Sequence, residues 1–194
     1  MDTLLDPQYW DKRYQAADTP WDLGTASRPL VRFFETLSDR QLRILIPGGG
    51  PGHELAWLWA HGFEAAYQLD YAPSIRAQAL ATYPEVPESR LLVGDFFAHS
   101  GQYDLIVEQT FFAALDPSLR PAYAEQMARL LVPGGRLAGV LFEFPLTEKG
   151  PPFGGHRTAY YTLLAPHFDR ICLGTCHTSV PERLGKEVWL EALR

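Results

Sequence analysis

The sequence predicts an α/β fold, with a doubly wound, mostly parallel seven-stranded sheet, helices on both faces and an N-terminal helical cover. Three observations lead to this expectation. From residue 42 onward, short apolar runs alternate with segments of helical periodicity. The first apolar run ends at Ile46 and leads directly into a glycine-rich turn that opens a helix. Acidic residues follow several expected strands at their carboxyl ends, where parallel sheets bind ligands.

The individual elements follow from hydrophobic periodicity and turn residues. Strand 42–46 precedes the glycine-rich turn, and helix 54–61 carries Leu55 and Leu58 on one face before Gly62 ends it. Pro73 opens a helix that continues to residue 82, because proline is favoured in a first turn. The remaining expected elements are strands 65–69, 90–93, 103–107, 136–142, 170–175 and 187–193, and helices 117–131 and 160–164. Strands joined by helical crossovers run parallel and are covered on both faces.

The composition is that of an ordinary globular protein, and we expect one domain spanning residues 1–194. Residues 1–40 would form the N-terminal cover segment and residues 41–194 the core. The formal net charge of −6 leaves no sequence-wide basic footprint, so we expect no nucleic-acid partner. The N-terminus lacks the regions of a secretory signal, and no apolar run approaches the roughly 20 residues of a membrane span. We therefore expect a cytoplasmic protein with no membrane partner, as a monomer or weak homodimer.

The two cysteines are expected to be free thiols. Cys172 and Cys176 fall in or directly after the expected strand at about 170–175, roughly 13 Å apart at the rise of an extended chain, which is too far for a disulfide between them. We also expect no metal site.

The glycine-rich turn has the spacing G-x-G-x-G at Gly48, Gly50 and Gly52. Glycines let the backbone adopt positive φ and let a ligand lie against it. The dinucleotide fingerprint G-x-G-x-x-G would need its third glycine at position 53, which is His53, and this disfavours an NAD-dependent oxidoreductase. The observed spacing resembles motif I of class I S-adenosylmethionine (SAM) methyltransferases. A glycine turn with only a structural role is the alternative.

Acidic residues at strand ends are the other candidate ligands of a cofactor. Asp70 follows the second strand, where a carboxylate can accept hydrogen bonds from both hydroxyls of a ribose. Asp95 follows the third strand beside Phe96, a pairing that can recognise the amine and the face of an adenine. Glu108 closes the fourth strand, where it could bind the α-ammonium of a methyl donor or act as a base. Helix caps and structural turns are the alternatives at these positions.

Motifs along nearly the whole chain, taken together, resemble the thiopurine S-methyltransferase superfamily, and within it the halide/thiol methyltransferases. The motifs are Trp10-Asp11-Lys12-Arg13-Tyr14, Pro20-Trp21-Asp22-Leu23-Gly24, Ile46 to Glu54, Gln109 to Leu115, Arg120-Pro121-Ala122-Tyr123, Leu131 to Gly135, Gly150-Pro151-Pro152-Phe153 and Arg183 to Glu187.

The resemblance implies a Rossmann-like class I methyltransferase with SAM as cofactor and S-adenosylhomocysteine (SAH) as product. It implies that Trp21 closes over the cofactor, that Gly48 belongs to the cofactor turn, and that Glu108 lines the methyl-transfer site. Asp70 would hold the ribose, and Asp95 with Phe96 the adenine. Phe153 and Tyr160 would belong to the wall of the acceptor pocket, with Glu108 and Tyr160 at the reaction centre. Trp10 and Phe111 are further pocket candidates because they lie in a covering segment and at a strand end. His156 and Arg157 could orient a small anion, and a surface loop position is the alternative for His156.

Departures from the family pattern fall mainly on the acceptor side. Gly49 stands where many members have cysteine, Glu108-Gln109 replaces an Asp-Tyr pair, and Gly154-Gly155-His156 replaces larger apolar residues. We expect methyl transfer to a small nucleophile, a thiol, sulfide, halide or thiocyanate. A methyltransferase for a larger acceptor, such as another small molecule, a protein or a nucleic acid, is one alternative. A non-catalytic SAM-binding protein is another.

Overall fold

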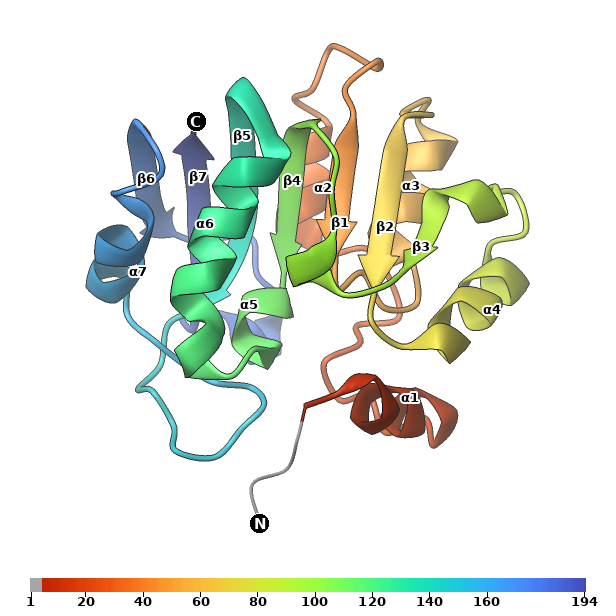
Figure 1. Ribbon diagram of the computed structural model, residues 1–194, viewed down its shortest axis with the longest axis horizontal. Helices are drawn as coiled ribbons and strands as arrows, with labels where there is room; N and C mark the ends of the chain where they lie inside the picture. The colour runs from red at the N-terminus through yellow and green to blue at the C-terminus, as the bar shows by residue number, and fades with distance from the viewer. Residues whose placement is uncertain (1–4) are drawn as a thin grey trace.

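The computed structural model describes residues 5–194 and has one seven-stranded sheet with helices on both faces (Figure 1). The strand order is β3-β2-β1-β4-β5-β7-β6. β1 to β5 are parallel, whereas β7 pairs antiparallel with both β5 and β6. The strands are β1 (Ile44–Pro47), β2 (Ala66–Asp70), β3 (Leu91–Val93), β4 (Tyr103–Gln109), β5 (Leu131–Phe142), β6 (Arg170–Thr175) and β7 (Glu187–Leu193).

The helices divide between the two faces of the sheet (Figure 1). Alternate residues of each central strand feed two separate cores, because successive side chains of a strand point to opposite faces. Leu45 and Ile106 pack with α6 and α7, while Ile46 and Val107 pack with α2, α3 and α4. The helices are α1 (Pro7–Gln15), α2 (Arg28–Phe34), α3 (His53–Ala60), α4 (Pro73–Thr82), α5 (Phe111–Ala114), α6 (Arg120–Leu130) and α7 (Arg157–Leu164).

Helix α1 lies across the carboxyl ends of β1 and β2, next to α4 (Figure 1). Asp6 caps its N-terminus by accepting the N–H of Tyr9 at 2.8 Å, and Pro7 follows in the first turn. The carboxylate of Asp11 accepts the N–H of Ser74 at 2.8 Å, which ties α1 to the start of α4. The N-terminal segment is thereby held over the edge of the sheet at which the strands end.

The predicted fold class is confirmed, and the expected strands and helices lie within a few residues of those observed. Three details differ. β5 begins at Leu131 and not after the Gly134-Gly135 turn, with a shift of register opposite Tyr103. The expected helix 117–131 is a 3₁₀ turn at Pro117–Leu119 followed by α6. The short helix α5, directly after β4, was not expected.

Within residues 5–194, Cys172 is exposed and Cys176 is buried, and both are free thiols, as expected. None of the helices in this part of the chain is long and apolar enough to span a bilayer.

Candidate active site

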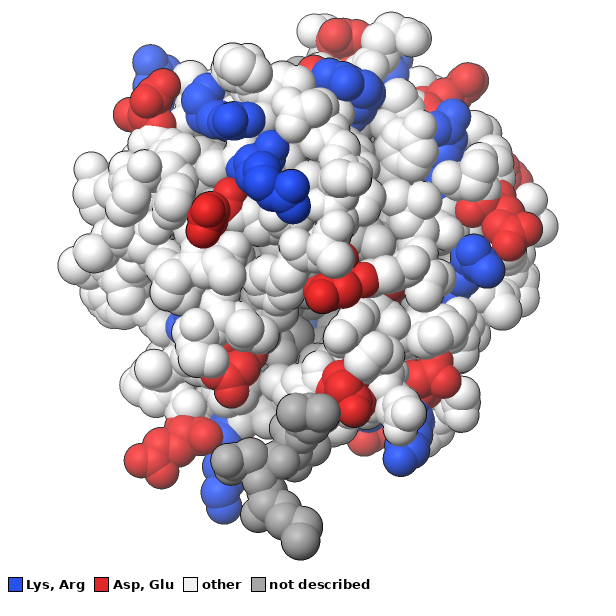
Figure 2. Space-filling model, viewed as in Figure 1, with Lys and Arg blue, Asp and Glu red and all other residues white. Residues whose placement is uncertain are grey.

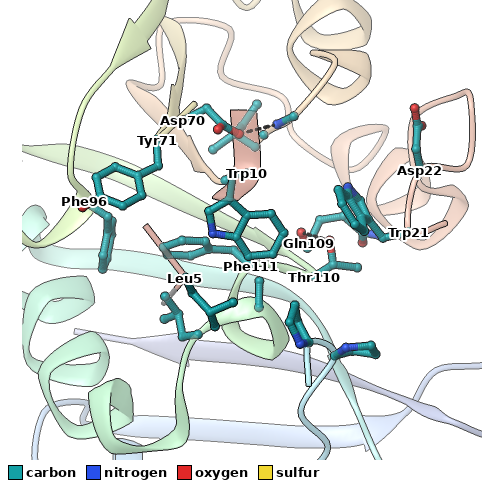
Figure 3. A pocket seen from close by; sticks show the side chains of 18 of the residues that line it. Leu5, Trp10, Trp21, Asp22, Asp70, Tyr71, Phe96, Gln109, Thr110 and Phe111 are labelled. Atoms are coloured by element: carbon teal, nitrogen blue, oxygen red, sulfur yellow. Dashed lines mark hydrogen bonds between the residues drawn. The ribbon is translucent and has the colours of Figure 1, made fainter. Parts of the chain in front are cut away.

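A cavity of about 900 Å³ opens at the carboxyl ends of the parallel strands, in the crevice between β1 and β4. The chain leaves these two strands toward opposite sides of the sheet, and such a switch in strand order is where doubly wound sheets bind ligands. The volume is near the upper end of the range of about 300–1,000 Å³ typical of small-molecule sites. Aromatic side chains from α1, the cover segment and the strand ends surround it (Figure 3).

The glycine turn after β1 forms one wall of this cavity, through Gly48, Gly49 and Gly50. Gly48 has φ of +61°, and a Cβ there would lie 2.6 Å from Cδ2 of Phe111. Gly50 has φ of +54°, and a Cβ there would lie 3.3 Å from the hydroxyl of Tyr14. The dihedral angle therefore favours glycine at both positions, and at Gly48 the contact with Phe111 leaves no room for a side chain. Gly52, with φ of +91°, caps the N-terminus of α3 and lies outside the lining of the cavity.

Asp70, the last residue of β2, lines the cavity beside the glycine turn (Figure 3). Its Oδ2 accepts the N–H of Gly50 at 2.9 Å and its Oδ1 accepts the N–H of Ala72 at 3.0 Å. Burial raises the pKa of this carboxyl above its ordinary value, while hydrogen bonds from the two N–H groups oppose the shift. Each oxygen keeps a second lone pair, so the carboxylate can still accept hydrogen bonds from a diol.

Tyr71, Asp95 and Phe96 form the end of the cavity below β2 and β3, where the side chains of Tyr71 and Phe96 lie near each other (Figure 3). The Asp95 carboxylate accepts the N–H of Phe97 at 2.9 Å, which turns the chain after β3 and presents Phe96. Phe96 packs edge-on against Phe111, with ring centroids 5.1 Å apart. An aromatic slot with a carboxylate at its rim suits a purine base with an exocyclic amine.

The cover segment closes the cavity from the N-terminal side through Trp10 and Trp21, whose rings meet edge to face at 5.6 Å. The guanidinium of Arg13 lies 4.7 Å from the Trp21 ring centroid, which is a cation–π distance. Nη2 of Arg183, from the loop before β7, donates to the backbone oxygen of Trp21 at 2.6 Å. Trp21 is thus held by residues from both ends of the chain.

Two consecutive residues at the start of α3 dock the cover segment onto the glycine turn. Nε2 of His53 lies 2.8 Å from Oδ1 of Asp22, and Nδ1 lies 2.6 Å from the hydroxyl of Tyr83. The buried carboxylate of Glu54 accepts the N–H of Ser27 at 2.8 Å. The residue that breaks the dinucleotide pattern therefore has a specific use here, since His53 connects α3 to the cover segment.

The structure places eight of the expected site residues together in the lining of this cavity. They are Trp10, Trp21, Gly48, Gly50, Asp70, Asp95, Phe96 and Phe111.

Glu108 differs from the expectation, because it is fully buried behind the cavity and not part of its lining. Its Oε1 accepts the N–H of Phe112 at 2.9 Å, and its Oε2 accepts from the hydroxyl of Tyr123 at 2.7 Å. Burial raises the pKa of this carboxyl to about 7. Gln109 and Thr110, the next two residues, line the cavity in its place. We therefore correct the expected cofactor and base roles of Glu108 to a role in holding α5.

The expected acceptor wall also differs, because Phe153, His156, Arg157 and Tyr160 all lie outside the cavity lining. Phe153 and Tyr160 are buried, and the Tyr160 hydroxyl donates to the backbone oxygen of Phe142, while burial raises its pKa to about 12. His156 is exposed at the N-terminus of α7, and Arg157 is paired with Glu143. That end of the cavity is lined instead by Phe142, Phe144, Pro151, Pro152, Arg183 and Lys186.

Several of the lining residues were not expected, and some of these adjoin an expected residue or belong to a motif quoted above. Tyr71 follows Asp70, and Arg13 and Asp22 belong to the two tryptophan motifs quoted above. Arg183 begins the last of those motifs. For these residues the motifs were the available signal, whereas Phe142 and Phe144 line the cavity and lie in none of the quoted motifs.

The described residues hold no cluster of three or more metal-ligating side chains. An adenosyl cofactor requires a close-fitting backbone turn, an acceptor for its ribose hydroxyls and a surface for its adenine. This one cavity is lined by the glycine turn, the Asp70 carboxylate and the aromatic slot at Phe96.

Comparison with known proteins agrees with this geometry. The family model described as thiopurine S-methyltransferase matches residues 5–192. A probable thiol methyltransferase 2 from Arabidopsis thaliana is 31% identical over 184 residues, covering 92% of this chain and 81% of that protein. Thiocyanate methyltransferase 1 from the same plant is 32% identical over 186 residues, with the same coverage.

Among solved structures, 1,6-didemethyltoxoflavin-N1-methyltransferase from Burkholderia thailandensis, with bound SAH, superposes with a TM-score of 0.72 at 18% identity. The match covers 97% of this chain and 86% of that one, and shows a shared fold. The chain belongs to the thiopurine S-methyltransferase family and is a SAM-dependent methyltransferase.

Proposed function

We propose that this enzyme methylates a small sulfur nucleophile, a thiol or hydrosulfide, and that it also accepts thiocyanate or halide. The observation that supports this most is the shape of the cavity. It extends from Asp95 below β3, across the glycine turn, to Phe142 at the end of β5. The residues after β1, β2 and β3 suit the adenosyl part of SAM, which leaves the end below β4 and β5 for the acceptor.

The acceptor end combines apolar walls with positive charge. Phe111, Phe142, Phe144, Pro151 and Pro152 line it, and the charged residues at its edge are Arg183 and Lys186 with one carboxylate, that of Glu182. Nη1 of Arg183 is buried without a hydrogen-bond partner, 3.6 Å from Glu187. Such a wall excludes water while the cations attract a small anion.

SAM, when bound, supplies a methyl group on a positively charged sulfonium. The chain has only to position an anionic acceptor in line with it, and no strong base is needed, because a free thiol of pKa about 8.5 is already partly ionised near neutrality. Gln109 and Thr110 line this part of the cavity, and neither of these two side chains is a base (Figure 3).

The surface supports a small-molecule acceptor over a polyanionic one. On the face shown in Figure 2, lysine and arginine side chains are interspersed with aspartate and glutamate and form no continuous basic area. The relatives named thiol and thiocyanate methyltransferase support the same acceptor class. We further propose a monomer or weak homodimer located in the cytoplasm, with no nucleic-acid partner.

The test is a panel of acceptors incubated with the enzyme and SAM that carries a deuterated methyl group, with products identified by mass spectrometry. We expect labelled methanethiol from hydrosulfide and labelled methyl aryl sulfides from aryl thiols, with slower formation of methyl thiocyanate and methyl iodide. Labelled products only from amine or hydroxyl acceptors would show that the acceptor class is wrong. Binding of SAM without any product across the panel would favour a non-catalytic SAM-binding protein.

A further inference from the structure

Gln68, on β2, is buried beneath the glycine turn, with 1% of its surface exposed. It shares a face of the strand with Asp70, two residues later. Its Nε2 donates to the backbone oxygen of Gly50 at 2.7 Å, while Asp70 accepts the N–H of Gly50 at 2.9 Å. Between them, the backbone oxygen of Leu69 accepts the N–H of Gly48 at 2.7 Å. Three successive residues of β2 therefore hold the turn. Asp70 binds the N–H of Gly50, in the peptide before it, and Gln68 binds the backbone oxygen of Gly50, in the peptide after it.

Gly49 makes room for this glutamine. A Cβ on Gly49 would lie 2.5 to 2.7 Å from Cγ, Cδ and Oε1 of Gln68, and these are the three nearest atoms. Unlike Gly48 and Gly50, Gly49 has no φ in the left-handed region. Its lack of a side chain is therefore required by the volume of Gln68 and not by the dihedral angle of the backbone.

The amide of Gln68 is an unfavourable choice for a residue that only fills space. Its Oε1 is buried without a hydrogen-bond partner, and a buried unpaired acceptor costs stability that an apolar side chain of similar length would not. Within residues 5–194, the amide makes one hydrogen bond, from its Nε2 to the backbone oxygen of Gly50. That bond is the evident reason for an amide at this position.

We propose that Gln68 is a positioning residue for SAM binding, and that Gly49 and Gln68 form a size-matched pair that sets the shape of the glycine turn. The inference rests on the proposed placement of the cofactor against Gly48 and Gly50. Loss of the Gln68 bond would free the peptide after Gly50, and a larger residue at 49 would displace Gln68 and break the same bond.

Three single substitutions, Gln68→Met, Gln68→Ala and Gly49→Ala, and one double variant test the pair by calorimetric titration with SAH. Gln68→Met keeps the length of the side chain and removes the donor, and should raise the Kd for SAH about fivefold. Gly49→Ala should raise it about tenfold or more, because the new methyl group displaces Gln68. In the double variant Gly49→Ala/Gln68→Ala the methyl group has room, so its Kd should lie within about twofold of that of Gln68→Ala alone.

A role in cofactor positioning also predicts a specific kinetic pattern. In Gln68→Met the KM for SAM should rise with Kd, while kcat at saturating SAM and the KM for the acceptor stay near the wild-type values. Gly174→Ala is the matched control, since Gly174 lies in β6 with open space around it and no left-handed φ. It should change neither Kd nor Tm.

Additive effects of Gly49→Ala and Gln68→Ala on Kd would overturn the inference and leave the proposed function intact. An unchanged Kd in folded Gln68→Met would do the same. If Gly49→Ala fails to fold, recovery of folded protein in the double variant supports the pair, and failure of both variants contradicts it. Absence of SAH binding by the wild-type protein would overturn the proposed placement of the cofactor and this inference together.

Discussion

Replacement of Asp70 by alanine is the mutation whose effect the structure predicts most directly. The carboxylate accepts two backbone N–H groups, from Gly50 at 2.9 Å and from Ala72 at 3.0 Å, and it faces the cavity. Hydrogen bonds to a charged group contribute about 1.5–3 kcal/mol each. Asp70→Ala removes the acceptor for both N–H groups and for the ribose of the cofactor. We expect SAH binding to weaken by about 1.5–3 kcal/mol, or roughly 10- to 150-fold in Kd.

Calorimetric titration with SAH measures this change, and circular dichroism checks that the variant is folded. Asp104→Asn is the matched control, because Asp104 also accepts a backbone N–H from a distant segment, that of Arg43 at 2.8 Å, but lies at the opposite end of β4. It should lower stability and leave SAH binding unchanged. A folded Asp70→Ala variant with the affinity of the wild type would refute the assignment of Asp70 to the cofactor site.

Three further predictions concern the buried carboxyl and the cover segment. Burial raises the pKa of Glu108 to about 7, so the folded protein keeps this proton between about pH 4.5 and 7 while the unfolded chain releases it. The free energy of unfolding therefore falls as pH rises through that range, and Glu108 contributes at most about 3 kcal/mol to this fall. Glu108→Gln should remove the contribution, which urea titrations at pH 5 and pH 8 would measure. His53→Gln and Asp22→Asn should each raise the Kd for SAH several-fold, and the double variant should add little, because both break one contact. Trp21→Ala should raise the KM for SAM and leave the Tm nearly unchanged, because Trp21 is half-buried and covers the cavity.

Each of these has a contradicting outcome. An equal stability difference between Glu108→Gln and wild type at both pH values would show that Glu108 is charged in the folded protein. Additive effects of the Asp22 and His53 substitutions would show that their contact does not hold the cover segment. An unchanged KM for SAM in Trp21→Ala would remove Trp21 from the cofactor site.

The sequence was sufficient to predict the fold because local pattern and tertiary environment agree along most of the chain. Helix α4 begins at Pro73 and ends at Thr82, as proline and periodicity predict. The direction of β7 was not predicted, since hydrophobic pattern alone does not distinguish parallel from antiparallel strands. The connection between β6 and β7 (176–186) contains only a 3₁₀ turn, and such a short link without a helical crossover is itself a sign of antiparallel pairing.

Site residues could be predicted from the sequence where a motif determines the path of the backbone. They could not be predicted where the direction of a side chain determines whether the residue lines the cavity. Asp70 ends β2 and Asp95 follows β3 by two residues, at the edge where the sheet binds ligands, and both line the cavity. At the end of β4, Glu108 and Gln109 point to opposite sides, and which of them faces the cavity depends on the pleat. Phe153 lies in a long loop that packs by donating its N–H to the backbone oxygen of Ala113, a contact that no sequence pattern indicates.

A crystal structure of the protein with SAH tests the central claim, the placement of the cofactor in this cavity, most directly. We predict that the ribose hydroxyls contact Asp70, that the adenine lies beside Asp95 and Phe96, and that the amino-acid end points toward Gly48 and Gln109. Contacts of SAH with Glu108 or Tyr160, or density for SAH outside this cavity, would contradict the account.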